Sequence, residues 1–96
     1  MFRVSSELYD EIARRLREAF GGAGYFSGSV ECAEGETDCR LTASLVLYHR
    51  RDEWPEGPQL RLTDAVPVWW EFHTVTDGVE VPNDFSFTAL RPALLA

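Results

Sequence analysis

Three polar residues in the last third of the chain, Glu71, His73 and Asp84, have side chains that could perform acid–base chemistry or bind a divalent cation. The dipeptide Asp77-Gly78 between them is typical of a type I′ hairpin turn. Such a hairpin places Glu71 opposite Asp84 and His73 opposite Pro82. Two carboxylates that face each other repel and destabilise the hairpin. A nearby arginine, a proton shared between the carboxylates, or a divalent cation with His73 as a further ligand would offset this repulsion. We favour the interpretation in which an arginine or solvent screening offsets the repulsion, because structural charge networks are commoner than catalytic or metal sites.

The cysteines and a glycine-rich run are the other features with chemical potential. Cys32 and Cys39 supply at most half of a zinc site, so we expect free buried thiols, with a disulfide as the alternative. The run Gly21-Gly22-Ala23-Gly24 follows a predicted helix, whereas a phosphate-binding loop precedes one. The run therefore predicts the end of a helix, and we expect no cofactor and no bound metal.

Composition excludes several functional classes. The chain has 96 residues, 16 acidic against 9 basic ones and a net charge of −7, and every basic residue is an arginine. This balance opposes direct binding to nucleic acid, whose affinity comes from neutralising phosphates. No signal pattern and no long apolar run is present, so we expect no membrane contact and a cytoplasmic location. The length predicts one domain over residues 1–96.

A helix at the start of the chain and two alternating segments can be assigned from their patterns. Ser5 is the expected N-cap, an apolar stripe that includes Leu8, Ile12 and Leu16 follows, and the glycines end the helix. Residues 25–32 and 39–49 are typical of half-buried strands, with a polar loop over 33–38.

The register of this hairpin follows from its cross-strand pairs. If the numbers of opposite residues sum to 71, Cys32 faces Cys39 on the inner side and Glu31 faces Arg40 on the outer side. A slip by one residue would turn every apolar side chain outward. We therefore predict this register.

The second half of the chain predicts two more strands. Prolines, a glycine and charges predict a loop over 50–59, and Pro67 predicts an edge position or a bulge. Pairs that sum to 155 around the Asp-Gly turn place Trp70 opposite Phe85 and Val68 opposite Phe87 on the inner face.

The tail predicts a short helical turn broken near Pro92. The predicted fold class is α+β: one N-terminal amphipathic helix packed on a four-stranded antiparallel meander sheet, with a short C-terminal helical turn.

One helix covers only one face of this sheet, which leaves Tyr25, Val46, Tyr48 and Trp69 on the outer face. An apolar surface of this kind more often marks a protein interface than a stacking platform for sugars or bases. We expect a homodimer through this face, or an unidentified protein partner.

The leading hypothesis is therefore a small acidic, non-catalytic protein–protein interaction or accessory domain. One alternative is a metal-dependent or acid–base enzyme that uses Glu71, His73 and Asp84. A second alternative is an acidic nucleic-acid mimic that inhibits a DNA-binding protein.

Overall fold

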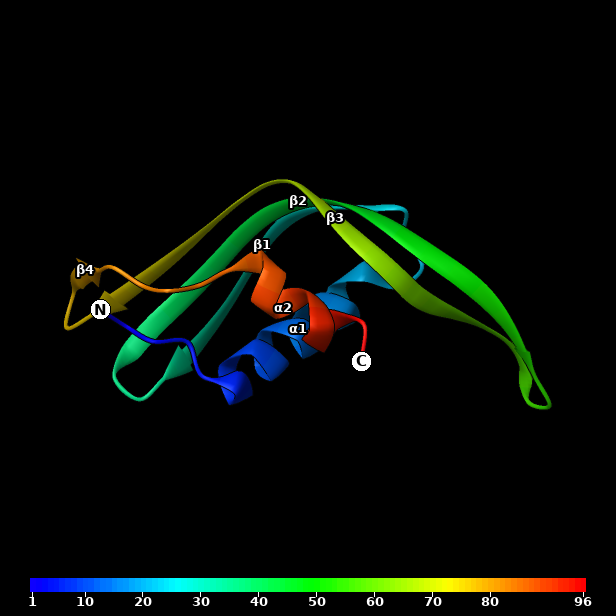
Figure 1. Cartoon of the computed structure of the whole chain (residues 1–96), viewed down its shortest axis with the longest axis horizontal. Helices are drawn as coiled ribbons and strands as arrows, with labels where there is room; N and C mark the ends of the chain where they lie inside the picture. Colours follow the sequence, from blue (N-terminus) through cyan, green and yellow to red (C-terminus); the bar gives the residue numbers. More distant parts are fainter.

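The computed structural model describes all 96 residues and shows two helices on one side of a curved antiparallel sheet (Figure 1). The elements are α1 (Ser6–Phe20), β1 (Tyr25–Glu34), β2 (Thr37–Trp54), β3 (Gly57–Thr76), β4 (Val79–Val81) and α2 (Phe87–Leu94). The strand order β1-β2-β3-β4 follows the chain, so the sheet is a meander. The predicted α+β fold class is confirmed, with its N-terminal helix and its short C-terminal one. Neither helix combines the length and the apolar character that crossing a bilayer requires.

Helix α1 begins and ends where its residue types predict. The Ser5 side chain accepts a hydrogen bond of 3.1 Å from the Leu8 amide, which satisfies one of the free donors of the first turn. Gly21 ends the helix with φ +54°, a conformation that glycine adopts without steric cost. The buried stripe of α1 consists of Leu8, Ile12, Ala13, Leu16 and Phe20.

The β1–β2 hairpin has the predicted register along its whole length. Ten residue pairs sum to 71, from Tyr25–Val46 at one end to Glu34–Thr37 at the other. The strands extend further than predicted, because the connection is a two-residue turn, Gly35-Glu36, and not a loop over 33–38. Gly35 has φ +61°, which permits this tight turn.

The predicted loop over 50–59 is wrong, because β2 and β3 continue through it as a two-stranded arm. Their pairing reaches Trp54–Gly57, and only Pro55 and Glu56 form the turn. Figure 1 shows the arm extending beyond the helices, in green, and the molecule measures 49 × 24 × 18 Å. The charges that suggested a loop lie on the arm, where Asp52 accepts a hydrogen bond of 2.9 Å from Arg50.

The predicted irregularity at Pro67 is confirmed as a β-bulge. Ser44 pairs with Trp69 and Leu45 pairs with Pro67, so Val68 is the extra residue. The β3–β4 hairpin has the predicted Asp77-Gly78 turn, with both residues at positive φ.

The pairs that sum to 155 are confirmed only for three positions, because β4 ends at Val81. The predicted pairings of Trp70 with Phe85 and of Val68 with Phe87 are therefore wrong. Pro82 cannot donate to the ladder, and the next segment pairs with the N-terminus instead, where the Phe2 amide donates to the Pro82 carbonyl at 2.8 Å. The Trp70 and Phe85 rings still meet edge to face, with centroids 5.2 Å apart.

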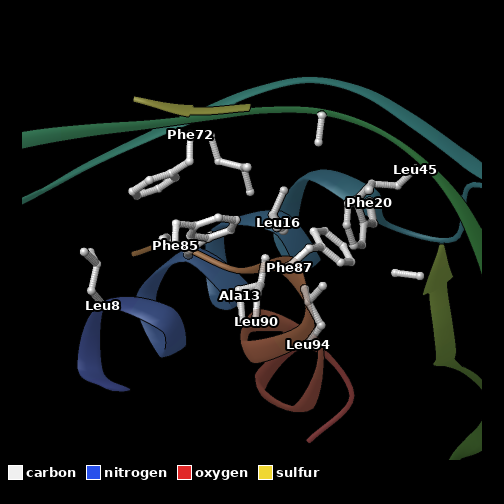
Figure 2. Close-up of a cluster of buried hydrophobic side chains, with 14 of the residues drawn as sticks. Leu8, Ala13, Leu16, Phe20, Leu45, Phe72, Phe85, Phe87, Leu90 and Leu94 are labelled. Carbon is white, nitrogen blue, oxygen red and sulfur yellow. The ribbon is translucent and has the colours of Figure 1, made fainter. Parts of the chain in front are cut away.

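The hydrophobic core lies between the inner face of the sheet and the two helices (Figure 2). Helix α2 presents Phe87, Leu90 and Leu94 to α1, at the spacing of one helical face. Pro92 lies inside α2 and does not break it, contrary to the prediction. The core has 16 buried residues, namely Leu8, Ile12, Ala13, Leu16, Phe20, Cys39, Leu41, Ala43, Leu45, Leu47, Ala65, Phe72, Phe85, Phe87, Leu90 and Leu94. Both helices pack on the inner face, so the outer face of the sheet has no cover within this chain.

Candidate functional site

The outer face of the sheet carries a group of apolar side chains that we call the outer patch. Tyr25, Val46 and Val66 lie in a row across β1, β2 and β3, because Val46 pairs with both of the others. Tyr48 follows Val46 on the same face of β2. About half of each aromatic side chain is in contact with solvent: 53% for Tyr25 and Tyr48 and 49% for Trp69. The outer patch consists of Tyr25, Val46, Tyr48, Val66, Val68 and Trp69.

We include Val68 in this patch because it is exposed and adjacent in the chain to Trp69, at the bulge in β3. The prediction placed Val68 on the inner face, two residues from Trp70 in a regular strand. An extra residue interrupts the alternation of side chains, and Val68 is 66% exposed beside Trp69. Sequence reasoning therefore missed Val66 and Val68, although Pro67 between them was the signal for a bulge.

Hydroxyl groups lie next to the outer patch on β1 and β2. Ser27 and Ser44 form a hydrogen bond of 3.0 Å, and Ser29 and Thr42 form one of 2.8 Å. These pairs satisfy each other across the strands, so this strip of the outer face offers a neutral surface that an apolar partner can cover.

The far end of the outer face is charged. Arg40 pairs with Glu31 across β1 and β2, as the register predicted, and its Nε donates to the carboxylate at 2.8 Å. His73 lies directly opposite Arg40 on β3. Its Nδ1 contacts Glu80 of β4, and its Nε2 lies 3.3 Å from the Glu71 carboxylate. Glu31, Arg40 and His73 border a shallow open depression here.

The structure does not bring the predicted polar cluster together. Glu71 and His73 are neighbours, but Asp84 lies outside the sheet and accepts a hydrogen bond of 2.8 Å from the Val4 amide. The predicted pairing of Glu71 with Asp84 is wrong, because β4 stops before it. Glu80 takes the place of Asp84, and it could have been found from the hairpin register, which puts it diagonally across from His73. No group of three or more His, Cys, Asp or Glu side chains in the chain is arranged to hold a metal ion.

The two glutamates next to His73 give its imidazole a higher pKa in the folded protein than in the unfolded chain. Hydrogen bonding to Glu80, and then to Glu71, raises the pKa of His73 above its ordinary value of 6.5. The interaction therefore stabilises the folded state fully below pH 6.5, and this contribution is lost as the pH rises through the folded-state pKa.

We expect Glu80→Gln to lower the pKa of His73, because the substitution removes the strongest cause of the shift. The pKa is measured by NMR titration of the imidazole protons, and Glu7→Gln on α1 is a charge-matched control distant from the sheet. An identical His73 titration in Glu80→Gln and wild type would contradict this arrangement.

The two cysteines lie opposite each other, as predicted, and both are free thiols. Burial raises the pKa of the Cys39 thiol to about 11 and also raises that of Cys32. The thiolate is the reactive form of cysteine. These side chains are therefore packing residues of the inner face and not nucleophiles at neutral pH.

The outer face thus has an apolar part over the bulge and a charged part at the β1–β2 turn, with hydroxyl pairs between them. Comparisons of the chain with models of protein families, with curated proteins and with solved structures found no match.

Proposed function

We propose that this protein is a non-catalytic protein-binding domain and that its outer patch docks on the same patch of a second copy. The observation that carries the proposal is the row of Tyr25, Val46 and Val66 over three strands, with exposed aromatic neighbours, on a sheet face that no helix covers. Exposed apolar surfaces that are continuous and rich in aromatic residues are typical of protein interfaces.

The size and chemistry of the patch support a second copy as the partner. The three half-exposed aromatic rings offer roughly 300 Å², against about 800 Å² that each partner buries in a standard interface. The three valines and the neighbouring hydroxyl pairs add to this area. A two-fold axis brings the patch against itself, and no residue of the patch is charged. The patch side chains themselves therefore bring no charge into the interface, although each copy has a net charge of −7.

The direct test compares two arginine substitutions of equally exposed valines. Val68 in the patch is 66% exposed and Val79 on β4 is 63% exposed. An arginine in an interface loses its hydration without gaining a partner, which typically weakens binding by roughly 30-fold or more. We expect Val68→Arg to reduce the solution mass by at least half relative to wild type, and Val79→Arg to leave it unchanged.

The masses are measured by light scattering over a range of concentrations, with circular dichroism and thermal melting to confirm that both variants fold. A wild-type protein that stays at 10.9 kDa at every concentration would contradict self-association. Equal masses for wild type and Val68→Arg would assign any assembly to another surface.

A further inference from the structure

The free edge of the sheet at β1 exposes backbone groups in a known pattern. The Leu47 amide donates to the Gly24 carbonyl at 2.9 Å, so Gly24 and Leu47 occupy a hydrogen-bonded position of the ladder. Bonded and non-bonded pairs alternate along an antiparallel ladder, and the register has no irregularity. Even-numbered residues of β1 therefore bond to β2. The odd-numbered residues direct their N–H and C=O groups away from the sheet, and these are Tyr25, Ser27, Ser29, Glu31 and Ala33.

The opposite edge of the sheet, on β3, is protected in several ways. Pro58 and Pro67 lack a donor, and the bulge at Val68 interrupts the line of the strand. The Asn83 side chain donates to the Phe72 carbonyl at 3.1 Å. An ion pair between Arg91 of α2 and Asp64 of β3 holds helix α2 next to this edge.

Helix α1 packs against β1, but the β1 edge lacks the prolines, the bulge and the side-chain hydrogen bond that interrupt the β3 edge. The ten residues of β1 include no proline, its pairing has no bulge, and no side chain forms a hydrogen bond with its outward backbone groups. A long regular edge of this kind is a template for pairing with another strand.

We propose that the edge of β1 pairs antiparallel with β1 of a second copy, with Ser29 opposite Ser29 at the two-fold axis. Ser29 is the midpoint of the five outward residues. Ser27 then pairs with Glu31, and Tyr25 pairs with Ala33, in both directions. Each of these pairs exchanges two hydrogen bonds, so all outward backbone groups are satisfied by about ten new bonds. The edge uses different atoms from the outer patch, so this interface does not depend on the proposed function.

The charge pattern agrees with this register. Glu31 lies opposite Ser27 of the other copy, away from its own counterpart, and Arg40 already neutralises it. A parallel arrangement would place Glu31 beside Glu31 of an acidic second copy, which is unfavourable.

The test uses Val68→Arg as the parent protein, because this substitution removes the outer-patch interface and leaves only the edge. We expect the parent to have twice the mass of 10.9 kDa at high concentration. Addition of Ser29→Pro should return it to 10.9 kDa, because proline removes an outward backbone donor; it breaks no backbone bond to β2, although the hydroxyl bond from Ser29 to Thr42 is lost. Addition of Ser29→Thr, which keeps the donor, should leave the dimer intact. A parent that is monomeric at every concentration would overturn the proposal.

Hydrogen exchange in the parent protein gives a second readout that does not depend on the folding of a proline variant. We expect the amides of Ser27, Ser29 and Glu31 to exchange more slowly as the protein concentration rises. Fast exchange at these amides that does not change with concentration would overturn the edge pairing. Slow or fast exchange at these amides tests only the edge pairing. The proposed outer-patch interface is tested separately, by comparing the solution masses of wild type and Val68→Arg.

Discussion

Replacement of Leu16 by alanine is expected to lower the free energy of unfolding by about 2–5 kcal/mol. Leu16 is completely buried, and Figure 2 shows its side chain in the cluster between the helices and the sheet. The substitution removes apolar contacts and leaves a cavity that the surrounding side chains fill only in part. Domains of this size have total stabilities of about 5–15 kcal/mol, so this one change removes a large fraction of the stability.

The matched control is Leu60→Ala, the same substitution on the arm. Leu60 is 58% exposed, and we expect a loss below about 1 kcal/mol. Both values come from urea unfolding followed by circular dichroism. Similar losses for Leu16→Ala and Leu60→Ala would contradict a core that is confined to the space between the helices and the sheet.

Replacement of Asn83 by alanine is expected to lower the free energy of unfolding by about 1–3 kcal/mol. The Asn83 side chain donates to the Phe72 carbonyl at 3.1 Å and to the Thr74 hydroxyl at 3.2 Å, and it accepts from the Phe85 amide at 3.1 Å. Thr74 is completely buried, so alanine leaves polar groups without partners where water has little access. The backbone amide of Phe85 should also exchange faster with solvent.

Asn83→Asp is the control of equal shape for this prediction. The aspartate keeps an acceptor for the Phe85 amide but cannot donate while it is ionised. Its charged form is disfavoured beside the Phe72 carbonyl, so we expect the loss of stability to be smaller below about pH 4, where the carboxyl can donate again. Unfolding free energies of Asn83→Ala and wild type that agree within about 0.3 kcal/mol would contradict this role.

Local patterns were sufficient to predict the helix, the β1–β2 register and the three residue pairs next to the Asp77-Gly78 turn. Ser5 and Gly21 bound α1, and the pairs Cys32–Cys39 and Glu31–Arg40 identified the pairing of β1 with β2. A strand alternates its side chains strictly, so one correct pair determines all the others.

Long-range pairing accounts for the errors. Residues 50–59 have the composition of a loop, but they pair across the arm and form a continuous ribbon. The Asp-Gly turn predicted a long β4, and the chain instead left the sheet at Pro82 to bond with Phe2, about 80 residues away in the sequence. Such competition between partners cannot be judged from a local pattern.

The candidate site was predicted in part for the same reasons. Tyr25 and Val46 lie in the β1–β2 pairing, whose register was predicted correctly. Tyr48 and Trp69 lie beside the two irregularities of the β2–β3 pairing, for which no register was predicted. The regular alternation that placed Val68 on the inner face does not hold at the bulge, where Val68 is the extra residue.

The proposal that the outer patch docks on the same patch of a second copy is tested most directly by NMR measurement of intermolecular contacts. Copies with labelled valine methyl groups are mixed with unlabelled copies, and filtered experiments detect only contacts between different copies. We expect contacts from the Val66 and Val68 methyl groups to the rings of Tyr48 and Trp69 in the other copy. Associated copies without these contacts, or copies that stay monomeric at the concentrations used for NMR, would contradict the proposal.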